Sequence, residues 1–416
     1  MADFSVRHFF KYRGNEPSRR ISKIPPSQKW ERHGCGELGI CISMTTVDSS
    51  KQTNNSMARR VVVAMSGGVD SSTAAALLKE QGYDVIGISM QLWDYTEGER
   101  DRPGSCCSLD DLYDARRVAD RLDMPFYVAN FEEVFSRTVV DYFVKSYLSG
   151  ETPNPCLKCN QILKFEVLLK RAIELEADYL ATGHYARVEY DNDRNRYLLL
   201  KGGDISKDQS YFLFTMTQRQ LSKIIFPLGN LTKTEVRRLA KKFGLNVADK
   251  KDSQEICFTP EGYPSFIVRQ TGSVADARGE IVDTGGAVLG MHDGLYKYTI
   301  GQRKGIGITR GEPLYVLNID ARKNQLVVGP EDGLFADGLI AKETNWIGIP
   351  SLDSPMEVIA KIRYRHRGVE AVVESMEDGM VRVRFKKREK SVTPGQAVVF
   401  YKKDEVIGGG WIEKRL

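Results

Sequence analysis

The residues best suited to chemistry form one run in which β-branched side chains give way to two glycines and then to helix-starting residues. At positions 61–72 it reads Val-Val-Val-Ala-Met-Ser-Gly-Gly-Val-Asp-Ser-Ser. Gly67 and Gly68 lack the Cβ atom that would keep the backbone away from an anion, and Asp70 and Ser71 are residue types found at helix starts. Unpaired N–H groups and the helix dipole would then converge on one oxyanion. We predict a phosphate-binding turn, with an ordinary strand-to-helix turn as the alternative. The chain contains no Gly-x4-Gly-Lys-Ser/Thr string, so this is not the common nucleoside-triphosphatase loop.

Thiols form the second reactive group. Cys156 and Cys159 occur in Pro-Asn-Pro-Cys-Leu-Lys-Cys-Asn, ahead of a predicted helix whose dipole lowers a thiol pKa, and Cys257 follows about a hundred residues later. The alternative for Cys-x-x-Cys is half a zinc site. Four zinc ligands would need two more close thiols or imidazoles, and the adjacent Cys106 and Cys107 lack the usual spacer. For Cys257 taken alone, the alternative is a buried, inert thiol.

The elements that must position these groups alternate between strand and helix from residue 60 onward, which predicts an α/β domain with a parallel sheet. We predict helices over 72–81, 109–122 and 160–176, and strands over 83–90, 125–129 and 179–182. In open parallel sheets, ligands lie beyond the carboxyl ends of strands. The loops after Met65, Met90 and Thr182 should therefore share one cleft. Met90 and Gly183 become candidates for an adenosine pocket, with plain core or turn positions as the alternative.

Composition and residue patterning divide the chain into four parts. Residues 1–57 have scattered charges and no sustained period, and we predict a disordered tail, a mis-assigned start before Met57, or an organelle-targeting segment. Residues 58–260 carry the phosphate turn and the cysteines. Glycines punctuate short segments over 261–336, which we predict to be a small central domain. Alternating patterns over 337–416, such as Val-Arg-Val-Arg-Phe at 381–385, predict a C-terminal β-barrel.

Composition limits the class of protein. The formal net charge is +5, but the first 56 residues hold nine Lys and Arg against five Asp and Glu, which leaves +1 for the remainder. Net charge alone therefore does not argue for nucleic acid. No stretch approaches the roughly 20 apolar residues of a membrane span, so we expect a soluble, intracellular protein with no membrane partner. Seven cysteines in 416 residues are too few for a disulfide scaffold.

The run Ser-Gly-Gly-x-Asp-Ser resembles the pyrophosphate loop (PP-loop) of the ATP pyrophosphatase superfamily, whose Rossmann-like members split ATP into AMP and pyrophosphate. From about Arg60 to the C-terminus, the chain is similar to the tRNA 2-thiouridylase family. The shared motifs occur in the family's order: Ser-Gly-Gly-Val-Asp-Ser-Ser, Thr-Pro-Asn-Pro-x-x-x-Cys-Asn, Ala-Thr-Gly-His-Tyr-Ala, Lys-Asp-Gln-Ser-Tyr-Phe-Leu, Asp-Ser-Gln-Glu-Ile-Cys-Phe and Gly-Gln-Arg-Lys-Gly. The resemblance implies a cytoplasmic enzyme that uses ATP and Mg²⁺ to replace the C2 oxygen of the wobble uridine, position 34 of the tRNAs for Lys, Glu and Gln, by sulfur.

The resemblance also implies roles for particular residues. Cys257 would carry a persulfide received from a cysteine desulfurase or a sulfur-relay protein, and Cys159 would be the nucleophile that closes a Cys159–Cys257 disulfide. The implied ATP-binding residues are Ala64, Met65, Ser66, Gly67, Gly68, Val69, Asp70, Ser71, Met90 and Gly183. The implied contacts to tRNA or to the target base are Asn154, Pro155, His184, Lys207, Asp208, Gln209, Arg363, Tyr364 and Gln396. Basic stretches at 361–367, 386–388 and 301–305 would add phosphate contacts, with solvated charged faces as the alternative.

One position departs from the family pattern. Many members place an acidic residue, proposed as general acid or base, where this chain has Cys156. Either proton transfer falls to water or another group, or Cys156, Cys159 and Cys257 together bind an iron–sulfur cluster with one open iron. Two alternative functions stay open: another PP-loop RNA-modifying enzyme, and a non-catalytic nucleotide- or RNA-binding protein with a redox disulfide.

Overall fold

A computed structural model of the chain describes residues 58–93, 108–252, 256–259, 261–272, 277–308 and 311–416. The expectations for residues 1–57, and those involving Cys106 and Cys107, lie outside these ranges. Within the described ranges, none of the helices combines the length and hydrophobicity that crossing a membrane demands.

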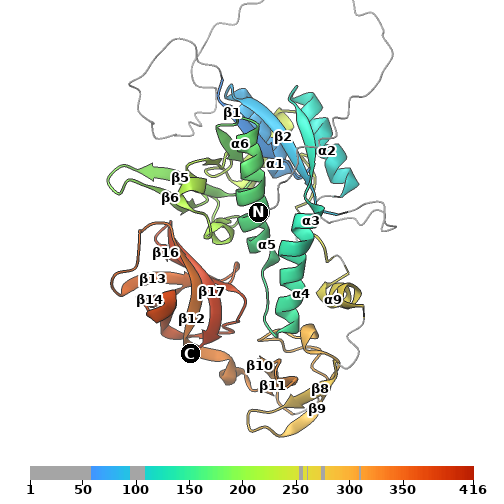
Figure 1. The fold of residues 1–416 in the computed structure, drawn as a ribbon, viewed down its shortest axis with the longest axis vertical. Coiled ribbons are helices and arrows are strands. Elements are labelled where there is room, and N and C mark those ends of the chain that lie inside the picture. Colours follow the sequence, from blue (N-terminus) through green and yellow to red (C-terminus); the bar gives the residue numbers. More distant parts are fainter. Residues whose placement is uncertain (1–57, 94–107, 253–255, 260, 273–276, 309–310) are drawn as a thin grey trace, which may run out of the picture.

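The first part of the chain contains the predicted parallel sheet, with strand order β3-β2-β1-β4-β7. Its strands β1 and β2 are labelled in Figure 1. The strands are β1 (Arg60–Ala64), β2 (Asp84–Gln91), β3 (Phe126–Asn130), β4 (Tyr179–Ala181) and β7 (Ile224–Ile225). β1 pairs in parallel with both β2 and β4, so the strand order reverses beside β1. This is the position at which ligands bind in open α/β sheets. The predicted fold class is confirmed.

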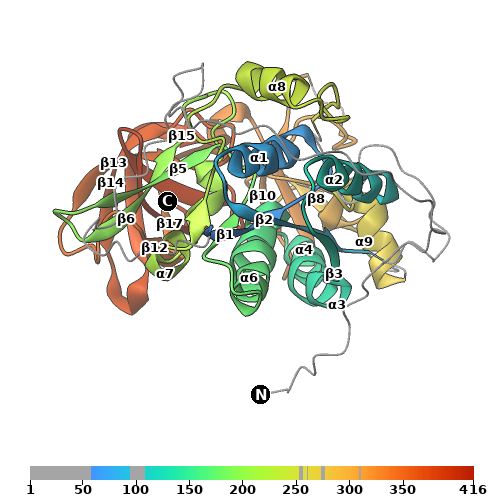
Figure 2. The same cartoon turned by 90° about the horizontal axis from the view of Figure 1, so that it is seen from above.

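Both faces of this sheet are covered, which explains why its strands read as continuous apolar runs. Val61 and Val63 pack with α1 (Val69–Glu80), α2 (Leu109–Arg121) and α8 (Lys233–Lys242). Val62 points to the opposite face and packs with the helices of residues 132–174. Figure 2 shows α1, α2 and α8 on one side of the sheet and α4 and α6 on the other. Alternation of side chains along β1 thus anchors helices on both faces.

The predicted helix over 160–176 begins earlier, at Pro155, and runs through three consecutive segments. These are α5 (Pro155–Lys158), the π-helical η2 (Cys159–Leu168) and α6 (Leu169–Glu174). Asn154 caps the start, because its Oδ1 accepts from the Leu157 N–H at 3.3 Å. Proline at the first helical position lacks only an N–H that would be unpaired there, so Asn-Pro is itself a helix-start signal.

The sequence reading did not identify several further elements of this part. They are α3 (Glu132–Phe135), η1 (Ser136–Val140), α4 (Asp141–Leu148), β5 (Ala186–Asp191), β6 (Arg196–Lys201), η3 (Ser210–Leu213), α7 (Gln218–Leu221), α8 and α9 (Tyr263–Thr271).

The central part is a four-stranded sheet in the order β10-β11-β8-β9. Its strands are β8 (Gly279–Val282), β9 (Val288–His292), β10 (Tyr315–Asp320) and β11 (Gln325–Gly329), with short helical turns η4 (Leu295–Lys297) and η5 (Glu331–Leu334).

The C-terminal part is the predicted barrel. Its strands are β12 (Phe335–Trp346), β13 (Met356–Lys361), β14 (Val369–Ser375), β15 (Val381–Lys390), β16 (Ala397–Lys402) and β17 (Glu405–Arg415), with the turn η6 (Glu377–Gly379) between β14 and β15. β12 pairs with both β15 and β17, which closes the barrel. The β5–β6 hairpin of the first part joins this sheet through β17, where Glu405 pairs with Leu200 (Figure 1). The barrel is therefore hydrogen-bonded to the part that carries the phosphate turn.

Candidate nucleotide and thiol site

The loop between β1 and α1 has the backbone of an anion cradle. Gly67 lies in the left-handed region at φ +70°, and a Cβ there would also overlap the backbone oxygen of Asp111. Gly68 precedes α1 in an extended conformation, and no side chain caps the helix start. The first-turn N–H groups of α1 are thus left for a ligand.

Ser71 holds this loop in shape. Its hydroxyl accepts from the Ser66 N–H at 3.2 Å and donates to the Gly68 carbonyl at 3.3 Å. Gly183, just beyond β4, backs the loop closely, since a Cβ on it would lie 2.7 Å from the Ser71 nitrogen. The other predicted nucleotide-binding residues of this region, Ala64, Met65, Val69 and Met90, have buried side chains.

Asp70 is held by two residues that lie far away in the sequence. The Tyr185 hydroxyl donates to its Oδ1 at 2.8 Å, and Lys233 Nζ donates to both carboxylate oxygens at 2.8 Å. Burial, and next the charge of Asp70, raise the pKa of Tyr185 strongly, so its hydroxyl remains a donor. The same Lys233 ammonium lies 2.7 Å from Asp252 Oδ1.

Asp252 gathers further cations. Lys207 Nζ lies 2.8 Å from its Oδ2, and the Arg237 guanidinium lies 3.1 Å from its Oδ1. Partial burial by itself would raise the pKa of Asp252, but hydrogen bonds from Lys207 and Lys233 lower it overall. Asp252 is therefore ionised and pairs with three basic side chains.

Lys250 contacts the loop from another direction. Its Nζ donates to the Gly67 carbonyl at 3.1 Å and lies 2.6 Å from Asp111 Oδ1 and 2.5 Å from Asp114 Oδ2. Burial opposes its charge, yet the two carboxylates raise the pKa of Lys250 overall. The lysine thus fixes the glycine loop to the start of α2.

Cys156 and Cys159 lie three residues apart on one helical run, which places them on neighbouring positions of its surface. Cys156 is exposed, whereas Cys159 and Cys257 are partly buried against one hydrophobic core. No disulfide joins these three thiols. The residue after Cys257, Phe258, is buried against Phe143, with ring centroids 5.0 Å apart. Over the described ranges, no three or more His, Cys, Asp or Glu residues are grouped to hold a metal ion, so the three thiols do not form an iron–sulfur ligand set here.

Three of the residues predicted to contact tRNA hydrogen-bond to neighbouring groups of the protein. His184 is 8% exposed, and its Nδ1 lies 2.7 Å from Thr182 Oγ1. Asp208 is buried and accepts from the Gly202 N–H at 3.1 Å. Gln209 Oε1 accepts from the Tyr185 N–H at 3.0 Å and so orients the tyrosine that donates to Asp70.

Of the other predicted contacts, Gln396 links the barrel to the segment that precedes the cysteine-bearing helix. Gln396 Nε2 donates to the Thr152 carbonyl at 2.8 Å, two residues before Asn154 and three before the buried Pro155. The Tyr364 ring lies 4.5 Å from that of Phe212, centroid to centroid. Asn160, next to Cys159, donates to the Phe212 carbonyl at 3.3 Å. Arg363 is exposed and donates to the Lys390 carbonyl at 3.3 Å.

The basic stretch at 386–388 is partly neutralised. Lys386 Nζ lies 2.9 Å from Glu357 Oε1, and Arg388 lies 3.7 and 3.8 Å from Asp332 and Asp337.

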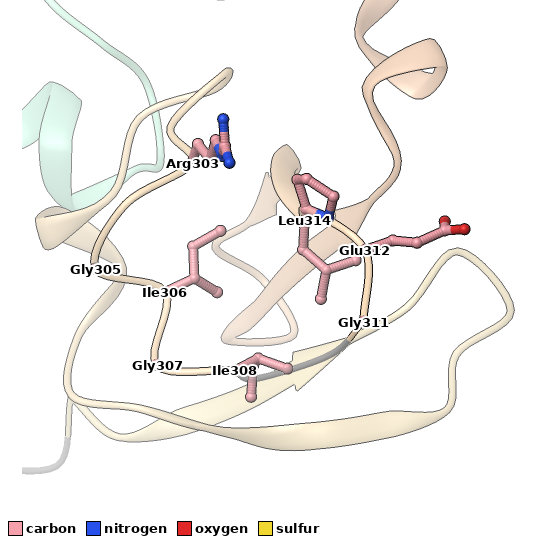
Figure 3. Close-up of a pocket in the computed structure, with 9 residues that line it drawn as sticks. Arg303, Gly305, Ile306, Gly307, Ile308, Gly311, Glu312 and Leu314 are labelled. Carbon is pink, nitrogen blue, oxygen red and sulfur yellow. The ribbon is translucent and has the colours of Figure 1, made fainter.

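The central part contains a cavity of about 500 Å³ lined by residues 303, 305–308 and 311–314 (Figure 3). It shares no residue with the glycine loop or the thiols, and we assign it neither nucleotide nor sulfur chemistry.

Sequence reasoning missed Tyr185, Lys233, Lys250 and Asp252 as site residues. Tyr185 and Asp252 lie inside motifs that the family resemblance includes, so those motifs could have identified them as candidate site residues. Lys233 follows Thr232 in a capping box, which signals a helix start but not the partner of the lysine.

A glycine loop at the reversal point of a parallel sheet, with helices on both faces, defines a Rossmann-like α/β protein with a candidate phosphate-binding site. Family models match three successive regions: a tRNA methyl transferase HUP domain at 59–261, a tRNA methyl transferase PRC-barrel domain at 267–330 and an aminomethyltransferase beta-barrel domain at 336–412. The tRNA-specific 2-thiouridylase MnmA of Geotalea uraniireducens is 58% identical over 363 residues, 86% of this chain and 96% of that protein. Its namesake from Geobacter metallireducens is 56% identical over 359 residues, 85% of this chain and 97% of that protein. The chain belongs to the tRNA-specific 2-thiouridylase family.

Among solved structures, a 4-thiouridine synthetase–RNA complex with bound ATP matches 52% of this chain and 51% of its own, with 18% identity. Its TM-score of 0.31 is too low to support any inference.

Proposed function

We propose that this protein is a cytoplasmic, ATP-dependent tRNA-uridine 2-sulfurtransferase that thiolates the wobble uridine, position 34, of the tRNAs for Lys, Glu and Gln. Its products are 2-thiouridine, AMP and pyrophosphate. The observation that carries the proposal is the glycine loop at Gly67 and Gly68, whose Asp70 is tied through Lys233 to the stretch that precedes Cys257.

The first step is adenylation, because a uridine carbonyl oxygen is too poor a leaving group to be replaced directly. The uridine O2 attacks the α-phosphate of ATP, and pyrophosphate leaves. The N–H groups of residues 67–71 bind the phosphates and stabilise the departing charge. Asp70 would supply the hard oxygen ligands that suit Mg²⁺, and the bound ion would neutralise phosphate charge.

The second step transfers sulfur. The terminal sulfur of a Cys257 persulfide, supplied by a cysteine desulfurase or a sulfur-relay protein, attacks C2 and AMP leaves. The Cys159 thiolate then attacks Cys257 Sγ, which breaks the bond to the transferred sulfur and leaves that sulfur on C2. The resulting Cys159–Cys257 disulfide is reopened by a thiol reductant. Both thiols are partly buried against the same hydrophobic core.

The target base must leave its stack before C2 can react. Asn154 and Pro155 border the cysteine-bearing helix, and we place the flipped uridine there. Exposed Arg363, half-buried Tyr364 and the Lys207 side chain are the tRNA contacts that we propose for the barrel and the adjoining loop. His184, Asp208, Gln209 and Gln396 act indirectly, by holding the neighbouring backbone in place.

No reaction step is assigned to an iron–sulfur cluster, since Cys156, Cys159 and Cys257 form no metal-ligand group among the residues that the structure describes. Iron and labile sulfide in anaerobically purified protein, in a fixed ratio to the chain, would contradict this two-thiol route.

The decisive experiment is incubation with ATP, Mg²⁺, a persulfide donor and wobble-uridine tRNA, followed by nucleoside mass analysis and pyrophosphate measurement. Wild-type protein should form 2-thiouridine, and Cys257→Ser should release tRNA-dependent pyrophosphate without thiolation. Asp70→Ala should lose ATP turnover by about a hundredfold or more while its tRNA affinity is unchanged. Pyrophosphate release by the wild type without 2-thiouridine would indicate another PP-loop RNA-modifying enzyme, and neither product would indicate a binding protein.

A further inference from the structure

Lys233 is shared between the glycine loop and a stretch that leads to a reactive cysteine. Its Nζ lies 2.8 Å from both oxygens of Asp70 and 2.7 Å from Asp252 Oδ1, and its side chain is only 13% exposed. A poorly hydrated ammonium between two carboxylates responds strongly to any new charge. The phosphates of a bound nucleotide would bring such a charge to the first turn of α1, beside Asp70.

Asp252 limits where Cys257 can lie. Cys257 is five positions after Asp252, and an extended chain of five residues spans at most about 18 Å. Lys207 and Arg237 hold the same carboxylate at 2.8 and 3.1 Å, so Asp252 is fixed from several directions.

The same short stretch has a second attachment to the loop. Lys250, two residues before Asp252, donates to the Gly67 carbonyl at 3.1 Å. Both ends of residues 250–252 are therefore linked to the nucleotide loop, one through Gly67 and the other through Lys233 and Asp70. A change at the loop reaches this stretch by direct contacts.

We infer that Asp252 is a positioning residue that couples nucleotide binding to the placement of Cys257. The nucleotide phosphates compete with Asp252 for the Lys233 ammonium, and their bound cation competes with Lys233 for the Asp70 carboxylate. The nucleotide-bound and nucleotide-free states therefore hold residues 250–252 differently. Because such coupling is reciprocal, modification of Cys257 also changes nucleotide affinity. The inference rests on the proposed function only in the role given to Cys257.

The test measures how fast iodoacetamide alkylates Cys257 in the full chain, read from the Cys257 peptide by mass spectrometry. Rates are compared without nucleotide and with saturating α,β-methylene-ATP and Mg²⁺. We expect nucleotide to change the wild-type rate by about fivefold or more. In Asp252→Asn the change should fall below about twofold, with the analogue at a concentration that saturates this variant.

Asp249→Asn is the matched control, since Asp249 belongs to the same segment but is 82% exposed and pairs with Lys241. It should keep the full nucleotide effect. Lys233→Gln, assayed at saturating analogue, is the second test variant and should lose the effect as Asp252→Asn does.

An unchanged nucleotide effect in a folded Asp252→Asn or Lys233→Gln protein, or no effect in the wild type, would overturn the inference. The readout needs neither tRNA nor sulfur transfer. A failure here is therefore distinguishable from a failure of the thiolation assay, which is scored by 2-thiouridine.

Discussion

The imidazole of His184 is an uncharged structural group at the end of β4. It lies between the rings of Phe165 and Phe226, with centroid distances of 5.9 Å to each. Burial, and next the charge of Lys164, hold the pKa of His184 well below its usual range. A neutral ring beside Gly183 can share a hydrogen bond with Thr182 without adding a positive charge near the glycine loop.

We predict a pH dependence of stability from this residue. Its folded pKa is below the unfolded value of about 6.5, so protonation favours the unfolded state. The free energy of unfolding should therefore fall as pH drops below about 6.5, by up to about 1.4 kcal/mol per pH unit, with no contribution from this group above that pH. Urea unfolding between pH 7.5 and 5.5 measures how the free energy of unfolding changes with pH. That change should be smaller for His184→Gln than for the wild type. His292 and His366, whose pKa values are also lowered, contribute equally to both proteins, and equal changes in the two proteins would contradict the prediction.

At the scale of the element, the strand–loop–helix unit from β1 to α1 places two separate demands on Gly67. The backbone must enter the left-handed region, and the residue must leave room for the backbone of Asp111. The first demand is conformational and the second is steric. The chain offers a position that makes only the first demand, because Gly82 has φ +85° and a Cβ on it would meet no other atom within 4 Å.

We predict that Gly82→Ala costs about 1–2 kcal/mol of stability, the usual cost of left-handed backbone, and leaves pyrophosphate release unchanged. Gly67→Ala should cost more, because α2 must move away from the loop, and should lower tRNA-dependent pyrophosphate release at least about tenfold. Urea unfolding and the pyrophosphate assay measure the two effects. Equal stability losses in the two variants would show that the contact with Asp111 does not matter.

At the scale of the whole molecule, the barrel completes the environment of the thiol-bearing helix. The fully buried Tyr211 donates from its hydroxyl to the Ala397 carbonyl at 2.9 Å, and Asn345 Nδ2 donates to the Phe214 carbonyl at 2.6 Å. Together with the β5–β6 hairpin, these contacts fix Arg363 and Tyr364 relative to the first part of the chain. A tRNA held by the barrel would thus meet the cysteine-bearing helix in a defined orientation.

We predict that Arg363 and Tyr364 contribute to tRNA binding by different physics. Arg363→Gln should reduce the slope of log affinity against log salt by about 0.7–0.9, the value for one phosphate contact. Tyr364→Ala should weaken binding by about 1–3 kcal/mol through lost stacking, with the slope unchanged. Titrations between 50 and 200 mM salt would separate the two. A Tyr364→Ala slope that falls like that of Arg363→Gln would argue against stacking.

The sequence by itself determined the features that depend on neighbours along the chain. The glycine loop, the apolar parallel strands and the alternating barrel strands follow from backbone sterics and from side-chain periodicity, which act over a few residues. The cysteines could be singled out in the same way, because a reactive thiol is recognised by its type and by the helix start beside it.

Tertiary packing alone decided which distant groups meet. Lys233 reaches Asp70 across 163 residues because α8 packs beside α1, and the β5–β6 hairpin pairs with β17 although about 200 residues separate them. It also decided that His184 is interior and that Asp252 collects three cations. Such contacts depend on how the buried faces of whole elements pack together, and local residue patterns do not specify which distant residue will be the partner.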